Sequence, residues 1–135
     1  MRIFIDANII IDVLLNRQDF YEDASNVLNI CQNKKSALAP HTISNIFFIT
    51  RKDYTAKERK SMLLEILEFI DVVPIGKHQI VQALKNQKID DFEDALQLEC
   101  AKEFNADFIV SRDVSGFANT DIEVITPKEF VKRFE

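Results

Sequence analysis

Short apolar runs alternate along this chain with longer segments whose apolar residues recur every three or four positions. The continuous runs at 3–5 and 108–110 are typical of buried strands. Weaker strand patterns occur at 37–39, 72–75 and 124–125. Helical periodicity predicts helices over 10–14, 24–31, 41–49, 56–70, 79–84 and 91–104, with a last helix from Pro127.

This alternation predicts an α/β fold, in which a mostly parallel central sheet is covered by helices on both faces as a three-layer α/β/α sandwich. The two strong strands are apolar throughout, as strands buried on both faces are. A length of 135 residues is close to the usual size of one domain, so we expect a single domain over 1–135. In such folds the functional crevice lies beyond the carboxyl ends of the strands.

Composition and charge narrow the classes of protein. Apolar residues make up 47% of the chain, which favours a packed core over disorder. The net charge of −5, from 17 basic and 22 acidic side chains, argues against a protein that binds nucleic acid by phosphate neutralisation alone. No apolar run is long enough for a membrane span, and no signal-peptide pattern opens the chain, so we expect no membrane partner and a cytoplasmic location. Cys31 and Cys100 are expected to be apolar core residues.

Two aspartates follow the two strong strands. Asp6 comes directly after the run at 3–5, and Asp113 comes soon after the run at 108–110. Because the carboxyl ends of parallel strands lie at one rim of a sheet, we expect both carboxylates on the same rim. For either residue alone, a helix cap or a turn is the commoner explanation. The pair favours a shared site.

A third group of acids lies at 90–94, which reads D-D-F-E-D. Asp91 and Asp94 are three residues apart and share one face of the first helical turn. Helix capping explains one or two of these acids, since acidic side chains favour a helix N-terminus. Four acids in five positions repel one another unless something positive offsets their charge, and a divalent cation would do so.

Three segments together resemble the acidic motifs of the PIN-domain family, including its VapC-like toxins: D-A-N-I-I-I-D-V-L at 6–14, D-F-E-D-A-L-Q at 91–97 and I-V-S-R-D at 109–113. The resemblance spans nearly the whole chain. It implies a PIN-like fold and an endoribonuclease that uses Mg²⁺ or Mn²⁺, with RNA as substrate. For a VapC-like toxin it further implies an antitoxin partner, and PIN domains commonly form homodimers.

The resemblance also implies roles for single residues. Asp6, Asp94 and Asp113 match the acidic metal-binding positions of the family, and Asp91 resembles a supporting acid. Asn8 and Ser111 match polar positions beside these acids. They would complete a catalytic centre that activates water for attack on a phosphodiester.

One position departs from the family pattern. The family usually carries a Glu early in the helix after the second strand, where this chain has Asn45. An amide oxygen attracts a hard cation less strongly than a carboxylate and cannot act as a general base. Either the activity is weakened, or another acid supplies the missing negative charge. Asp91 is the candidate for that acid.

Other functions stay open at this stage. A non-catalytic PIN-like module that binds RNA or protein is the main alternative, since Asn45 would mark a decayed site. An aspartate-dependent phosphatase is less well supported, because Asn8 stands where that class needs a second Asp. Basic residues at 51–60 form either an RNA-facing edge or a solvated helix surface. His41 and His78 lack acidic or cysteine partners at ligand spacing and are not expected to bind metal.

Overall fold

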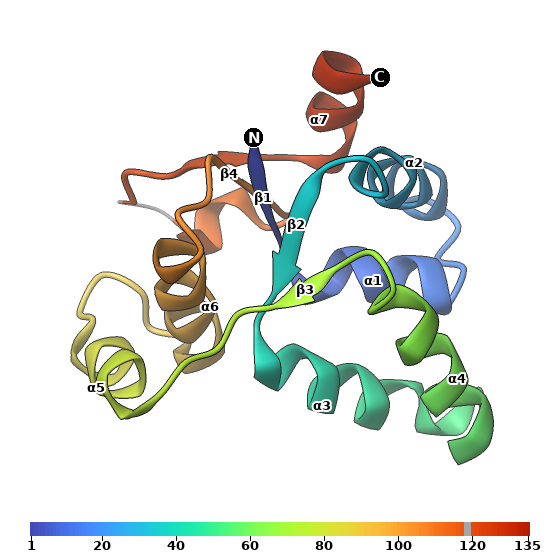
Figure 1. Cartoon of the computed structure of the whole chain (residues 1–135), viewed down its shortest axis with the longest axis horizontal. Coiled ribbons are helices and arrows are strands. Elements are labelled where there is room, and N and C mark those ends of the chain that lie inside the picture. The colour runs from blue at the N-terminus through green and yellow to red at the C-terminus, as the bar shows by residue number, and fades with distance from the viewer. Residues whose placement is uncertain (118–119) are drawn as a thin grey trace.

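The computed structural model describes residues 1–117 and 120–135, which form a five-stranded parallel sheet with helices on both faces (Figure 1). The strands are β1 (Arg2–Ile5), β2 (Lys35–Leu38), β3 (Asp71–Val72), β4 (Phe108–Val110) and β5 (Glu123–Ile125). The described α-helices are α1 (Ala7–Leu14), α2 (Tyr21–Cys31), α3 (Pro40–Ile49), α4 (Ala56–Ile66), α5 (Lys77–Lys85), α6 (Phe92–Glu103) and α7 (Pro127–Phe134). Two 3₁₀ turns, η1 (Thr50–Lys52) and η2 (Val114–Phe117), follow α3 and β4.

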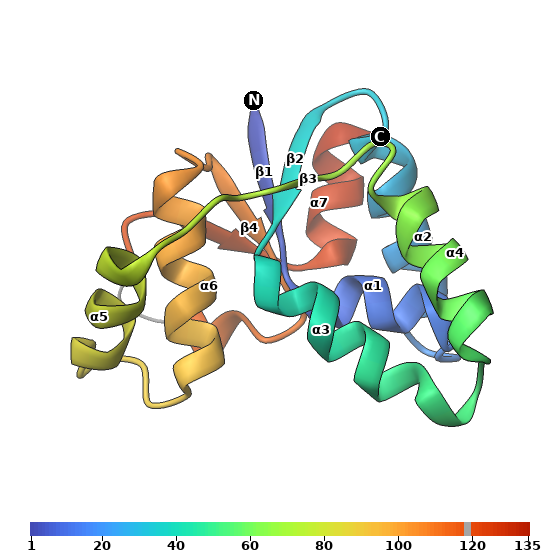
Figure 2. The same cartoon turned by 60° about the horizontal axis from the view of Figure 1, so that its bottom comes forward.

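Side chains of the sheet alternate between two hydrophobic cores. Ile3 and Ile5 point into the core formed with α1, α2, α4 and α7, whereas Phe4 points into the core formed with α5 and α6. All three side chains are fully buried. The two cores lie on opposite faces of the sheet because successive strand residues face opposite sides. Figures 1 and 2 show α5 and α6 on one side of the sheet and α1, α2 and α7 on the other, which confirms the predicted three-layer α/β/α arrangement.

The predicted elements are all present, and two of them are shorter than expected. The helix predicted over 56–70 ends at Ile66, after which a turn places Ile70 in the core ahead of β3. The strand predicted over 72–75 is limited to Asp71–Val72. β3 is an edge strand, and Pro74 has no N–H with which to continue the ladder. Within residues 1–117 and 120–135, no helix is long and apolar enough to cross a membrane.

The strand order places the carboxyl ends of β1 and β4 side by side at the switch point of the sheet. The order is β3-β2-β1-β4-β5. The chain adds β2 and β3 on one side of β1 and then β4 and β5 on the other side. Ile5 is in register with Val110, and the amide of Asp6 donates to the Val110 carbonyl at 3.0 Å. The first residues after β1 and β4 therefore meet where ligands bind in open α/β sheets.

Candidate active site

Asp6 is a buried carboxylate that accepts hydrogen bonds from three side chains. Ser111 Oγ donates to Oδ2 at 2.5 Å, Asn8 Nδ2 donates to the same oxygen at 3.2 Å, and Gln97 Nε2 donates to Oδ1 at 3.1 Å. These donors come from the segment after β4, from α1 and from α6. Each donor is neutral, so together they fix the orientation of the carboxylate and leave its negative charge in place.

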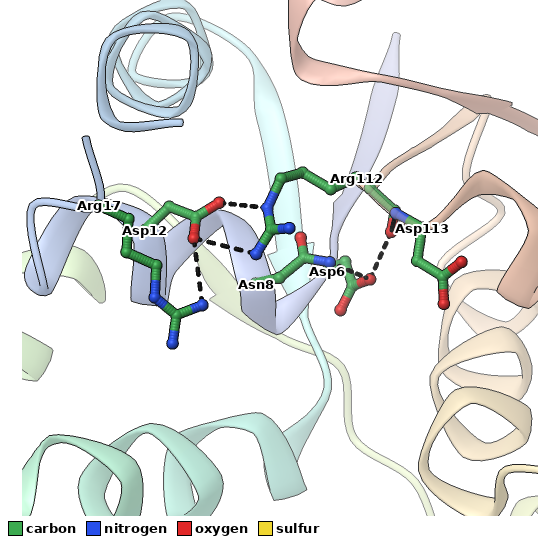
Figure 3. A network of polar contacts seen from close by, with 7 residues as sticks. Asp6, Asn8, Asp12, Arg17, Arg112 and Asp113 are labelled. Carbon is green, nitrogen blue, oxygen red and sulfur yellow. Dashed lines mark hydrogen bonds and ion pairs between the residues drawn. The ribbon is translucent and has the colours of Figure 1, made fainter. Parts of the chain in front are cut away.

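Asp113 lies on the neighbouring segment and is connected to Asp6 through Ser111. The Asp113 amide donates to Ser111 Oγ at 3.0 Å, while the same hydroxyl donates to Asp6. Oδ1 of Asp113 accepts from Ser115 Oγ at 2.9 Å and from the Gly116 amide at 3.1 Å. In Figure 3 the Asp113 carboxylate points away from the side chain of Arg112.

Gly116 brings the carboxylates of Asp94 and Asp113 into one small space. A Cβ atom at Gly116 would lie 2.6 Å from Asp113 Oδ2 and 3.2 Å from Asp94 Oδ2. Both oxygens thus face the same point, and only a residue without a side chain leaves that space open. The absence of a side chain at position 116 is a steric requirement of this close approach.

Burial and neighbouring charges act together on Asp94, which lies in the first turn of α6. The pKa of Asp94 is raised from 3.8 to about 6, first by burial and then by the negative charges of four acids, in decreasing order Asp91, Asp6, Asp113 and Glu93. None of the ion pairs within residues 1–117 and 120–135 involves Asp6, Asp94 or Asp113. These carboxylates are therefore close together without a lysine or arginine to balance them.

This donor set suits a hard divalent cation that keeps part of its water shell. In the part of the chain that the structure describes, no three Asp, Glu, His or Cys side chains converge tightly enough to hold one ion directly. Mg²⁺ commonly takes only one or two protein carboxylates and retains several waters. Asp94 and Asp113 supply such a pair, and the carboxylate of Asp6 adds negative charge that acts on Asp94. Buried oxygens without a protein partner, Asn8 Oδ1 and Gln97 Oε1, add acceptors beside them.

Asp91, the candidate for supplying the charge missing at position 45, and Asn45 make separate contacts at this rim. Asp91 is the N-cap of α6, and its Oδ1 accepts from the Asp94 amide at 3.0 Å. The carboxylate beside Asn45 is that of Glu93, because Asn45 Nδ2 donates to Glu93 Oε2 at 3.1 Å. Asp91 acts on the site by capping the helix and by its charge.

Sequence reasoning missed three residues at this rim. Gln97 is 4% exposed and follows Asp94 by three residues. A polar residue at a buried position of α6 was the feature of the sequence that could have identified it. Glu93 belonged to the acidic run but was assigned no role. Gly116 is one of only 2 glycines in the chain, yet its closeness to two carboxylates depends on tertiary structure.

His41 lies in the first turn of α3, close to these acids. Burial lowers the pKa of His41, and the negative charges of Glu93 and Asp6 oppose that shift. Its Nδ1 is buried and has no hydrogen-bond partner. Sequence spacing assigns His41 no acidic partner, so the effect of Glu93 and Asp6 on its pKa is an additional finding.

A buried ion pair fixes the segment that carries Ser111 and Asp113 (Figure 3). Asp12 of α1 is fully buried, and Arg112 donates to it from Nε at 2.6 Å and from Nη2 at 3.2 Å. Arg17 approaches the same carboxylate at 3.4 Å. The guanidinium of Arg112 also stacks on the ring of Phe20 at 4.0 Å. Arg112 therefore ties the loop after β4 to α1, whose first residues follow Asp6.

The basic residues at 51–60 are partly occupied by local contacts. Arg51 stacks on Phe48 and donates to its carbonyl at 3.0 Å. Arg59 stacks on Phe47 and donates to its carbonyl at 2.7 Å. These two arginines stabilise the end of α3 and its packing on α4, in agreement with the helix-surface interpretation.

Comparison with known proteins identifies the class to which this fold and rim of acids belong. The family model described as PIN domain matches residues 2–115, and the chain belongs to that family. Ribonuclease VapC1 of Aquifex aeolicus (strain VF5) is 27% identical over 139 residues, with 98% of this chain and 95% of that protein covered.

Solved structures agree on the fold. VapBC2 from Rickettsia felis, bound to a DNA fragment from its promoter, matches with a TM-score of 0.71 at 14% identity and covers 93% of this chain and 98% of that chain. A toxin-antitoxin complex from Klebsiella pneumoniae matches with a TM-score of 0.70 at 21% identity and covers 92% and 96%. The PIN fold expected from the acidic motifs is therefore confirmed.

Removing Arg112 should destabilise the protein, because Asp12 would stay buried with only the weaker contact to Arg17. We expect Arg112→Ala to lower the free energy of unfolding by about 3 kcal/mol, as measured by urea denaturation. Lys102→Ala breaks an exposed pair with Glu99 and should cost less than about 1 kcal/mol. Equal losses in the two variants would contradict a structural role for the buried pair.

Asp94 should make the metal-free protein less stable as pH rises from about 4 to about 7. Its pKa is raised in the folded state to about 6, so the folded protein holds this proton more tightly than the unfolded chain does. Above about pH 6 the ionised Asp94 carboxylate lowers the free energy of unfolding, and Asp94→Asn removes this effect. In chelator at pH 7.5 we expect Asp94→Asn to be more stable by about 1 kcal/mol, discounted because the side chain is partly exposed. The gain should disappear near pH 4, and a gain independent of pH would contradict this account.

Gly116→Ala should impair ion binding without unfolding the protein. The added methyl group would displace the end of the Asp113 side chain, which can rotate, so stability should change by less than about 1 kcal/mol. Affinity for Mn²⁺, measured by calorimetry, should fall by at least about tenfold. Gly76→Ala is the matched control, because a Cβ there meets nothing within 4 Å. Unchanged Mn²⁺ binding in Gly116→Ala would show that the two carboxylates do not share an ion.

Proposed function

We propose that this PIN-domain protein is a metal-dependent endoribonuclease that hydrolyses RNA phosphodiester bonds. The observation that carries the proposal is the shared space of the Asp94 and Asp113 carboxylates next to Asp6, with no cationic side chain paired to any of them in the described residues. Their repulsion favours a bound cation. The similarity to a protein named Ribonuclease VapC1 supports RNA as the substrate.

The proposed cation is Mg²⁺ or Mn²⁺, held by Asp94, Asp113 and Asp6. When bound, such an ion lowers the pKa of water and offsets negative charge that develops on the phosphate. Ser111 and Asn8 orient Asp6, and Gln97 holds its other oxygen. Asp91 caps the helix that presents Asp94. In this proposal the protein is acidic at its site and meets the RNA backbone through the ion.

A role as the toxin of a toxin-antitoxin pair is the biological part of this proposal. One similar solved structure is a toxin-antitoxin complex, and the similarity to Ribonuclease VapC1 covers almost the whole chain. An antitoxin would then cover the acidic rim, where basic side chains could take the place of the ion. The proposal includes a homodimer and a single domain over 1–135, and it places the protein in the cytoplasm with its RNA substrate.

A cleavage assay tests the proposal directly. Structured and single-stranded RNA are incubated with the protein in Mn²⁺, in Mg²⁺ and in chelator. We expect metal-dependent cleavage that Asp6→Asn and Asp113→Asn each reduce by at least about 10²-fold, because each substitution removes a negative charge beside the ion. Asp71→Asn is the matched control, since Asp71 is exposed on the edge strand β3, which β2 separates from β1.

Cleavage that survives chelation, or equal cleavage by wild type and both site variants, would contradict the catalytic proposal. RNA binding without cleavage in any metal would favour the alternative, a PIN-like module whose site is weakened by Asn45. That module should bind RNA equally well with and without Asp113→Asn.

A further inference from the structure

Asn45 and Glu93 form a hydrogen bond between two helices that are far apart in the sequence. Asn45 lies in the middle of α3, and Glu93 lies in the first turn of α6. Asn45 Nδ2 donates to Glu93 Oε2 at 3.1 Å across a separation of 48 residues. The contact places an acid of α6 against the α3 position at which this chain has an amide.

The location of Glu93 is the acidic rim itself. Glu93 is adjacent in sequence to Asp94, whose carboxylate shares the space beside Gly116 with Asp113. The negative charges of Glu93, on α6, and of Asp6, after β1, both oppose the lowering of the His41 pKa by burial. The Glu93 side chain is exposed and makes no ion pair within the described residues, which leaves its charge available to a ligand.

The chemistry of the contact preserves that charge. An amide N–H fixes one oxygen of a carboxylate without neutralising it, and the other oxygen stays free. A lysine or arginine at position 45 would cancel the charge, and a glutamate there would repel Glu93 at hydrogen-bonding distance. Among these side chains, only the amide of asparagine both holds Glu93 and leaves its negative charge available.

We propose that Glu93 is a fourth carboxylate of the metal site, held by Asn45, so that α6 supplies the negative charge that α3 lacks. The inference rests on the proposed metal-dependent function and assigns Glu93 and Asn45 within it. Glu93 acts on the ion through its water shell and through its charge. Asn45 acts through Glu93 and is a positioning residue.

A different role for Glu93 would be to stabilise the N-terminus of α6 through the helix dipole. That role predicts a loss of helix stability on substitution and no change in ion binding. Direct measurement of Mn²⁺ affinity separates the two roles, and it needs no RNA.

The experiment exchanges the two side chains and measures Mn²⁺ binding by calorimetry, with the signal of free Mn²⁺ in electron paramagnetic resonance as a second readout. Four proteins form a cycle: wild type, Glu93→Gln, Asn45→Glu and the double variant. Glu93→Gln keeps a hydrogen-bonding partner for Asn45 and should weaken Mn²⁺ binding by at least about tenfold. The double variant moves the carboxylate to α3 and should bind within about threefold of wild type.

The single substitution Asn45→Glu decides whether the two positions act together. We expect it to strengthen Mn²⁺ binding when residue 93 is Gln and to fail to do so when Glu93 is present, since two carboxylates would then repel. The same strengthening in both backgrounds would overturn the inference. So would unchanged binding in Glu93→Gln.

Asp90→Asn is the matched control, because it removes one charge from the same acidic run at a position outside this contact. It should change Mn²⁺ affinity by less than about twofold. Both exchanged side chains are at least partly exposed, so the variants should fold, and circular dichroism verifies it. Wild-type protein that binds Mn²⁺ without cleaving RNA would refute the nuclease proposal and leave this inference standing, whereas wild-type protein that binds no Mn²⁺ would refute both.

Discussion

The pairing of β1 with β4 is the constraint on which the acidic rim depends. Residues more than one hundred positions apart become neighbours because Ile5 and Val110 are in register at the centre of a parallel sheet. Each strand is buried on both faces, so a shift of one residue would turn apolar side chains from one core to the other and is strongly disfavoured. The hydrophobic pattern of two short strands thereby fixes where Asp6 and Ser111 leave the sheet.

The polar contacts at the rim orient the carboxylates of Asp6 and Asp113 but do not neutralise their negative charge. Serine, asparagine and glutamine donate to Asp6, and a serine and a backbone amide donate to Asp113. The guanidinium groups nearest to this region, those of Arg112 and Arg17, are occupied by buried Asp12. The protein thus separates two tasks. Asp12 is neutralised inside the fold and holds the loop after β4, whereas Asp6, Asp94 and Asp113 at the carboxyl rim have no cationic partner in the described residues.

Much of this arrangement was predictable from local patterns, and the remainder depends on contacts between distant segments. Asp6 and Asp113 were predictable because a carboxylate after a buried parallel strand must emerge at the carboxyl rim. Capping of α6 by Asp91 follows from the preference of helix starts for acids. The Asn45–Glu93 contact was not predictable, because the distance between α3 and α6 is set by packing across the sheet. The family pattern indicated a missing charge at position 45 but not the position of the nearest acid.

The acidic rim is sensitive to substitution at Gly116, although Gly116 itself carries no charge. Every other amino acid carries a Cβ, so any missense change of that codon places atoms where two carboxylate oxygens now face open space. Replacement by an uncharged residue such as alanine would keep the negative field of the rim intact, which exchanges of aspartate for asparagine do not. Such variants would therefore separate the effect of the open space from the effect of the charge, because the electrostatic attraction for a positively charged ligand would be undiminished.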